Sequence, residues 1–160
     1  MKQLTKEELF NLFTRTTKNS FQKKGRFLCR KAVEGETVLT IVGGKLETIK
    51  KASKDEVVLR NIEIGSSAET YIIEENKFTK RYDLTDKYHN IDNLPWTEAI
   101  AKGKVDAFCY HGKLIEITAP WGETMLCNEG DYIARPIDGD EKDIYRIEKN
   151  TFIQTYFQIE

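Results

Sequence analysis

The chain has 160 residues, a length that suits one domain or two small fused half-domains. Its 25 basic and 26 acidic residues leave a net charge of −1, so the chain as a whole offers no electrostatic field to nucleic acid or to an anionic membrane. No uninterrupted apolar run approaches the roughly 20 residues of a membrane helix, and the N-terminal MKQLTKEELF lacks the apolar core of a signal peptide. We therefore expect a cytoplasmic protein with no membrane partner.

The first segment, residues 1–20, is predicted to contain a helix over 6–17. Thr5 and Glu8 have the spacing of a capping box, in which each side chain binds the backbone N–H of the other residue. The apolar residues after this cap fall on one helical face: Leu9, Phe10, Leu12 and Phe13. We expect that face to cover an edge or face of a sheet, and docking on a partner is the alternative.

A basic stretch follows, formed by Lys23, Lys24, Arg26, Arg30 and Lys31. A solvated strand edge explains it, because exposed edges often carry lysine. The alternative is a nucleic-acid contact, whose binding would depend strongly on salt. Given the net charge, we do not expect a nucleic-acid partner.

From Arg26 onward the chain shows the β-branched and aromatic residues of strands. The strands predicted in the first half are 26–33, 37–42, 45–51, 56–62 and 70–73. Gly43-Gly44 predicts a tight hairpin, because glycine supplies the positive φ of such turns. Residues 63–69 have the composition of a loop, and 74–82 are predicted to form a helical turn that leads into a strand.

Residues 84–103 differ from what precedes them and are predicted to be a connector between two halves. They contain Asp and Asn clusters, a proline and then WTEAIAKG. Trp96 and Ile100 would share one helical face, and Gly103 stands where helices stop. The connector is therefore expected to include a short helix.

The second half repeats the order of the first. Residues 105–110 and 113–118 are predicted to pair through a hairpin at His111-Gly112. Further strands are expected at 124–128, 131–136 and 144–147, with a loop at 137–143.

Two twelve-residue segments, YIIEENKFTKRY at 71–82 and YRIEKNTFIQTY at 145–156, are identical at six positions. Upstream, Glu56–Arg60 aligns with Asp131–Arg135, and short gaps align Cys29 with Cys109 and Gly44 with Gly122. In each twelve-residue segment an alternating strand enters a helical turn, whose phenylalanine is expected to fill the core. The agreement in order predicts an internal duplication.

The expected fold is α+β and mainly antiparallel β. It comprises the N-terminal helix segment 1–20, a first β-rich repeat at 21–83, the connector 84–103 and a second β-rich repeat at 104–160. We expect these segments to form one compact domain.

The residues from Thr118 to Ile159 carry a further pattern. The matching positions are Trp121-Gly122-Glu123, Gly130-Asp131-Tyr132-Ile133, Tyr145, Ile147, Phe152 and Tyr156. This part of the chain resembles a group of small, often phage-encoded proteins of unknown function with a Pro-Gly-Asp-Tyr/Trp-Ile motif, and the first half echoes it more faintly. Glu129 stands where the group has proline. The resemblance implies a small β-rich fold and no particular reaction.

Few residues suggest catalysis or metal binding. Cys29, Cys109 and Cys127 include no CxxC pair and are expected to be buried free thiols. Cys109 and His111 could form a nucleophilic pair, but a hairpin tip excludes water poorly. His89, near Asp86 and Asp92, would need further ligands to hold a metal. The acidic run at 138–143 lacks the frame of a calcium loop. We expect no catalytic residue, metal or cofactor.

The best candidates for ligand binding are Arg60 and Arg135, which end matching strands. If both faced one cleft, their guanidinium groups would bind an anion. Four residues could assist them: Tyr71, Tyr145, Trp121 and Glu123. The alternative is that each arginine pairs with a local acid such as Glu56, Glu63 or Asp138.

From the sequence we expect a non-enzymatic binding protein of phage-linked type that acts on a protein partner through a sheet edge or the surface between the halves. The alternative is a binder of a small anionic, nucleotide-like ligand, or an enzyme, with a cleft between the halves. The sequence leaves the oligomeric state open.

Overall fold

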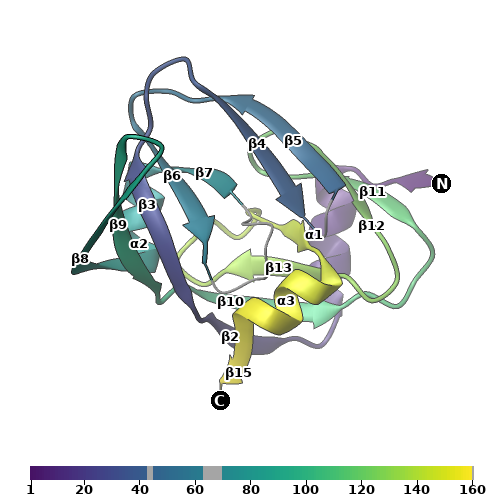
Figure 1. The fold of residues 1–160 in the computed structure, drawn as a ribbon. Coiled ribbons are helices and arrows are strands. Elements are labelled where there is room, and N and C mark those ends of the chain that lie inside the picture. Colours follow the sequence, from purple (N-terminus) through teal and green to yellow (C-terminus); the bar gives the residue numbers. More distant parts are fainter. Residues whose placement is uncertain (43–44, 63–69, 160) are drawn as a thin grey trace. The chain divides into compact units, whose positions relative to one another are not determined.

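The computed structural model describes residues 1–42, 45–62 and 70–159 (Figure 1). The predicted Gly43-Gly44 turn and the predicted 63–69 loop therefore lie outside the described residues. The chain divides into two compact units: unit 1 contains Met1–Lys23 and Lys104–Glu160, and unit 2 contains Lys24–Gly103. Nearly all of the described strand pairs are antiparallel, as predicted for a mainly antiparallel α+β fold.

Unit 1 is built on a five-stranded antiparallel sheet and a smaller three-stranded sheet. The strands of the larger sheet are, in order, β14 (Tyr145–Ile147), β13 (Tyr132–Pro136), β10 (Lys104–Cys109), β2 (Asn19–Lys23) and β15 (Tyr156–Ile159). Those of the smaller sheet are β1 (Lys2–Gln3), β11 (Ile115–Thr118) and β12 (Thr124–Cys127). Two helices, α1 (Lys6–Arg15) and α3 (Lys149–Thr155), complete the unit.

The predicted N-terminal helix is confirmed as α1, with both hydrogen bonds of the capping box between Thr5 and Glu8. Leu9 and Phe13 are buried and belong to the same core cluster as Ile115 and Ile117 of β11. The apolar face of α1 therefore packs within its own unit.

The described residues of unit 2 form a five-stranded antiparallel sheet, a separate hairpin and one helix. The strands of the sheet are, in order, β7 (Thr70–Glu74), β6 (Glu56–Asn61), β3 (Arg26–Lys31), β9 (Leu94–Ala101) and β8 (Tyr82–Ile91). The hairpin joins β4 (Thr37–Val42) to β5 (Lys45–Lys51), and the helix is α2 (Glu75–Arg81). The predicted hairpin strands and the predicted helical turn before Tyr82 are confirmed.

The predicted connector helix is wrong, because its residues form strand β9, which pairs with β8 and β3. Trp96 and Ile100 are four apart, a spacing that fits a strand face as well as a helix face. Ala99 and Ala101 point the other way and are buried in a cluster with Phe27 and Tyr82. Packing against these rings overrides the helical propensity of the segment. The turn between β8 and β9 is Asp92-Asn93, both with positive φ.

The predicted hairpin at His111-Gly112 is also wrong. Strand β10 pairs with β13 and β2, whereas β11 pairs with β12 and β1. The two strands belong to different sheets, so residues 110–114 form a crossing between sheets. Gly112 does not adopt the positive φ that a two-residue hairpin requires.

The five-stranded sheets of the two units have equivalent strand orders and pairings. In unit 2, Leu28 lies opposite Arg60, Leu59 opposite Tyr71 and Tyr82 opposite Ala101. In unit 1 the corresponding pairs are Asp106 with Arg135, Ala134 with Tyr145 and Tyr156 with Lys23. The strand pairing therefore places Arg60 and Arg135 at corresponding positions, and Tyr71 and Tyr145 likewise, in agreement with the alignment of the two sequence segments. It differs for the cysteines, since Cys29 corresponds to Ala107 and Cys109 to Lys31.

The core cluster that contains Phe78 of α2 and the cluster that contains Phe152 of α3 also correspond residue by residue. Eight members of the unit 2 cluster have a counterpart in unit 1: Phe27, Cys29, Val57, Leu59, Ile73, Phe78, Tyr82 and Ala99. Their counterparts, in the same order, are Val105, Ala107, Tyr132, Ala134, Ile147, Phe152, Tyr156 and Phe21. The predicted core role of Phe78 and Phe152 is confirmed, because both are buried.

A charged sheet face as the candidate functional site

One face of the unit 2 sheet carries an unusual set of charged side chains, which we call the polar face. It is formed by Arg26, Arg30, Arg60, His89, Trp96 and Glu98. The pairing register explains why they meet: Leu28 lies opposite both Arg60 and Glu98, and His89 lies opposite Trp96. Directly opposite residues share a face of an antiparallel sheet. The strands β6, β3, β9 and β8 therefore all contribute to this face.

Trp96 lies at the centre of the polar face and is 2% exposed. Its ring lies near two cations, with the guanidinium carbons of Arg30 and Arg60 at 4.9 and 4.8 Å from the ring centroid. Arginine is attracted to the face of an indole ring at such distances. Trp96 also shares a buried cluster with Leu28, Val38 and Val58, which anchors the ring in the unit.

Arg30 is held by a carboxylate. Its two terminal nitrogens donate hydrogen bonds of 2.8 and 2.6 Å to the oxygens of Glu36, a bidentate arrangement. These hydrogen bonds from Arg30 are the main reason that the pKa of Glu36 lies below its usual value. The guanidinium of Arg30 is therefore oriented by Glu36 while it lies near Trp96.

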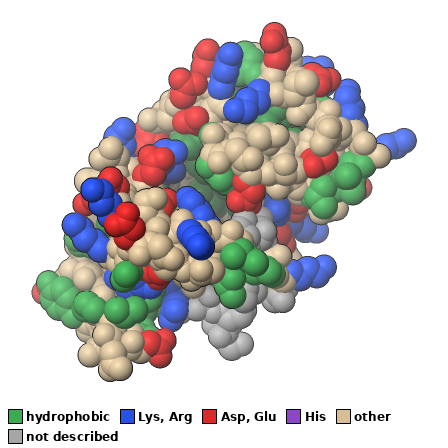
Figure 2. All heavy atoms as spheres, turned by 90° about the horizontal axis from the view of Figure 1, so that it is seen from above, with side chains coloured by type: hydrophobic (Ala, Val, Ile, Leu, Met, Phe, Trp, Pro, Cys, Tyr) green, Lys and Arg blue, Asp and Glu red, His purple; other side chains and the backbone are tan. Residues whose placement is uncertain are grey.

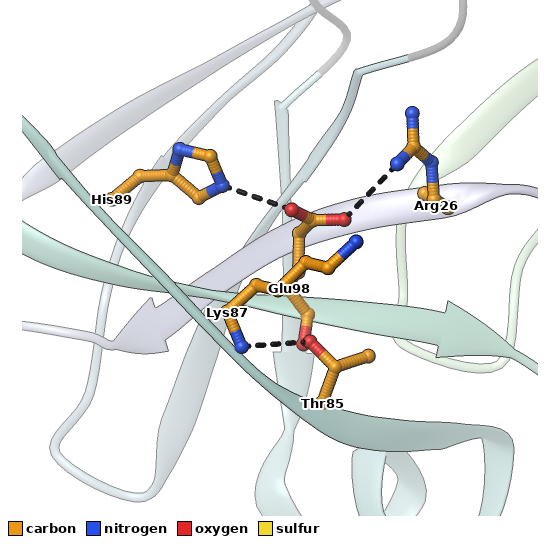
Figure 3. Close-up of polar contacts among 5 residues, drawn as sticks. All are labelled: Arg26, Thr85, Lys87, His89 and Glu98. Atoms are coloured by element: carbon orange, nitrogen blue, oxygen red, sulfur yellow. Dashed lines mark hydrogen bonds and ion pairs between the residues drawn. The ribbon is translucent and has the colours of Figure 1, made fainter.

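Glu98 is the second carboxylate of this region, and its side chain is only 7% exposed. Figure 3 shows it between His89 and Arg26, with His89 Nε2 at 2.9 Å from one oxygen and Arg26 Nη1 at 3.4 Å from the other. The hydrogen bond from His89 is the largest cause that lowers the pKa of Glu98, and the charges of Arg26 and Lys87 act in the same direction. Burial opposes them. Glu98 is thus held as a carboxylate.

The β8–β9 pairing is irregular beside Glu98. The register shifts between Leu84 and Tyr88, and the Thr85 hydroxyl donates to the backbone carbonyl of Glu98 at 3.1 Å. The same hydroxyl accepts from the backbone N–H of Lys87 at 3.2 Å, as Figure 3 shows. The Thr85 side chain thus satisfies backbone groups where the ladder is interrupted.

Arg60 differs from the other arginines of the polar face. Within residues 1–42, 45–62 and 70–159, no acid or hydrogen-bond acceptor pairs with its guanidinium, and its Nε atom is buried. The Nε1 atom of Trp96 is likewise buried without a partner in this part of the chain. Arg60 therefore carries a charge that no carboxylate of the described structure balances.

The other predicted ligand residues are distributed over both units. Arg135 lies over the Phe13 ring, 4.7 Å from its centroid, and donates to the backbone carbonyl of Glu141. Trp121 and Tyr145 are in contact, with ring centroids 5.5 Å apart, and Trp121 donates to Glu123. Tyr71 lies in β7 opposite Leu59, one position beyond the partner of Arg60.

The sequence offers the alternative that each arginine pairs with a nearby acid. Among the described residues, neither Arg60 nor Arg135 does so. Glu56 binds Lys50 at 2.8 Å rather than Arg60, and Arg135 donates to a backbone carbonyl. Glu63 lies outside the described residues. A cleft that joins Arg60 of unit 2 to Arg135 of unit 1 stays a prediction.

The basic stretch of the sequence lies in β2, β3 and the residues between them. Two of its cations are paired with carboxylates, Arg26 with Glu98 and Arg30 with Glu36. Figure 2 shows Lys and Arg interspersed with Asp and Glu over the described part of the face in view. This arrangement offers no single-sign surface there.

A hollow of about 380 Å³ in unit 1 is lined by Cys109, His111, Glu129, Gly130, Tyr132, Lys149 and Ile153. The Cys109 thiol contacts the carbonyl of Gly130 at 3.6 Å. In the described structure no hydrogen bond joins Cys109 to His111. All three cysteines are free, and burial raises the pKa of Cys29 to about 11 and of Cys127 to about 12. Nowhere in the described ranges do three or more His, Cys, Asp or Glu side chains gather as metal ligands.

Comparison with protein-family models, curated proteins and solved structures finds no significant match for this chain. Among the described residues, no helix has the length and apolar character needed to cross a membrane.

Proposed function

We propose that this chain is a non-enzymatic binding protein that adds an extended segment of a protein partner to strand β8. The observation that carries the proposal is the exposure of β8. This ten-residue strand pairs with β9 and with no other described strand. Its Leu84 and Tyr88 side chains are 63% and 75% exposed.

The physical basis is the edge of the sheet. The outer side of an edge strand presents backbone N–H and C=O groups that can pair with an added strand, while exposed side chains supply specificity. Figure 1 shows β8 at the margin of the unit 2 sheet. Asp83, Asp86 and Lys87 reduce indiscriminate pairing, since charge protects sheet edges. Large apolar residues on such a strand favour a specific partner.

The test compares capture of a partner from lysate by three chains. The double variant Leu84→Lys/Tyr88→Lys removes the apolar contacts of β8. The matched control Ile137→Lys changes a side chain of unit 1 that is 52% exposed. A partner that binds the wild type and the control but not the double variant supports the proposal. Equal capture by all three chains, or equal loss in both variants, contradicts it.

We also propose that units 1 and 2 derive from an internal duplication, and that the chain is related to the phage-encoded group with the Pro-Gly-Asp-Tyr/Trp-Ile motif and acts in the cytoplasm. The equivalent strand orders, registers and core clusters support the duplication. Residues 71–82 should then replace 145–156 without loss of folding. A scrambled segment of the same composition is the control, and equal unfolding of both chimeras would contradict the duplication.

A small anionic ligand is the second candidate function. It is favoured by one observation, that neither Arg60 nor Arg135 pairs with a carboxylate among the described residues. A shared cleft requires that Arg60→Gln and Arg135→Gln each weaken binding of ATP, the nucleotide probe. If only one substitution weakens binding, the shared cleft is wrong.

A further inference from the structure

Among the described residues, Arg26 and Arg30 of the polar face each pair with a carboxylate, whereas Arg60 does not. Arg26 pairs with Glu98, which also binds His89, and Arg30 pairs with Glu36. Arg60 has no carboxylate partner among the described residues, although it lies on the same face and over the same tryptophan ring as Arg30. The imbalance is confined to the Arg60 end of this face.

Buried donors without acceptors gather at the same place. The Nε atoms of Arg60 and Arg30 and the Nε1 atom of Trp96 are buried, and no described residue accepts from them. Buried donors are nearly always paired in folded proteins, because an unmet donor costs free energy. Trp96 has a donor and no acceptor, and arginine has donors only. A ligand that completes this set must therefore bring acceptor oxygens.

The carboxylates of the face limit what can bind. Glu98 lies two strands from Arg60 with the buried Leu28 between them, and successive strands are spaced by about 4.8 Å. The backbones of Glu98 and Arg60 are therefore about 10 Å apart along the row, and the charge of Glu98 is compensated by Arg26. Glu36 is likewise bound to Arg30. A small anion at Arg60 faces little repulsion, whereas a large polyanion would approach both carboxylates.

We propose that Arg60, together with the indole N–H of Trp96, forms a binding site for one small oxyanion of the phosphate or carboxylate class. The Arg60 guanidinium supplies the charge and a planar pair of donors. Trp96 supplies a further donor and holds the guanidinium against its ring. Arg30 is held by Glu36, lies near the Trp96 ring and helps to fix the position of that ring. The site lies entirely within unit 2 and does not require Arg135.

The experiment follows the fluorescence of Trp96 in a Trp121→Phe background during titration with inorganic phosphate, and separately with acetate, at constant ionic strength. Phosphate or acetate should change the signal saturably. Arg60→Gln should weaken binding at least tenfold. Arg60→Lys keeps the charge but loses the planar fork, so it should weaken binding less. Trp96→Phe, followed by calorimetry, should weaken binding several-fold.

The matched control is Arg15→Gln, which removes an exposed arginine of α1 in unit 1 and should leave binding within twofold of wild type, and Arg135→Gln tests the shared cleft. Circular dichroism confirms that each variant is folded. If neither anion binds saturably, or if folded Arg60→Gln binds like wild type, the site is disproved. An equal loss in Arg135→Gln would instead support the shared cleft and overturn the local site. Capture of a protein partner through β8 is unaffected by either outcome.

Discussion

Phe78 and Phe152 hold equivalent positions in the two units, and each stacks on the tyrosine four residues later. The ring centroids of Phe78 and Tyr82 are 5.2 Å apart with the planes at 10°, and those of Phe152 and Tyr156 are 4.8 Å apart with the planes at 12°. Helices α2 and α3 each end at this pair, since the tyrosine backbone N–H donates to the phenylalanine carbonyl. One short motif thus ends a helix, fills a core and begins a strand.

Removal of either phenylalanine ring should destabilise the protein strongly. Phe78→Ala and Phe152→Ala should each lower the free energy of unfolding by roughly 3–5 kcal/mol, because both leave a cavity in a buried cluster. Urea unfolding measures the loss. Phe157→Ala is the control, since that ring is 41% exposed and its loss should cost far less. A neutral result at either core position would refute the packing role.

The capping box of α1 should contribute measurably to stability. Thr5→Ala removes the hydroxyl that accepts from the backbone of Glu8 at 3.1 Å, and should cost about 1 kcal/mol. Thr14→Ala, in the last turn of the same helix, should be neutral or slightly stabilising because alanine favours helix. Thermal unfolding of both variants measures the difference. Equal effects would mean that the cap does not anchor the helix.

Stability should depend on pH through Glu98. Its pKa in the folded protein is below the ordinary value of 4.5, so folding favours the carboxylate. The resulting stabilisation is present above pH 4.5 and is lost as the pH falls through the folded pKa. Glu98→Gln should therefore lower stability at pH 7 and flatten the acid side of the profile. Glu116→Gln, which removes a carboxylate of β11 in unit 1, is the control, and an unchanged acid side of the profile in Glu98→Gln would contradict the prediction.

The three thiols should differ in reactivity. Cys29 and Cys127 are buried with raised pKa values of about 11 and 12, so little thiolate forms at pH 8. Cys109 is partly exposed and lines the unit 1 hollow. Iodoacetamide at pH 8 should modify Cys109 in the native protein and the other two only after denaturation. Mass spectrometry locates the label, and rapid native labelling of Cys127 would show that burial does not protect it.

Local signals predicted the elements whose structure depends on neighbouring residues. The capping box at Thr5 and the β-branched residues of 56–62 both correspond to observed elements. The connector could not be predicted in this way, because Trp96 and Ile100 fit a helix and a strand equally well. Whether this segment forms a helix or a strand depends on its pairing with β3, about 70 residues away in sequence. It also depends on the alanines that pack in one cluster with Phe27.

The same limitation explains which site residues were missed. The matching position of Arg60 marks it as a candidate, but the sequence favours a helix for Trp96 and Glu98 and a solvated edge for Arg30. An alternating interpretation of 94–101 would have placed Trp96 and Glu98 on one face. That Trp96 lies near both Arg60 and Arg30 depends on the strand order β6, β3, β9, which local sequence does not encode.

The route of the chain between the units suggests how they could be separated. The chain leaves unit 1 after β2 and returns at β10, and these strands are neighbours, with Gln22 opposite Lys104. Likewise, unit 2 starts and ends on neighbouring strands, with Arg26 opposite Ile100. Unit 2 is thus inserted where an ordinary hairpin turn would suffice. Residues 24–103 form one continuous segment for expression, whereas a cut between the sequence repeats would remove β9 from the sheet to which it belongs.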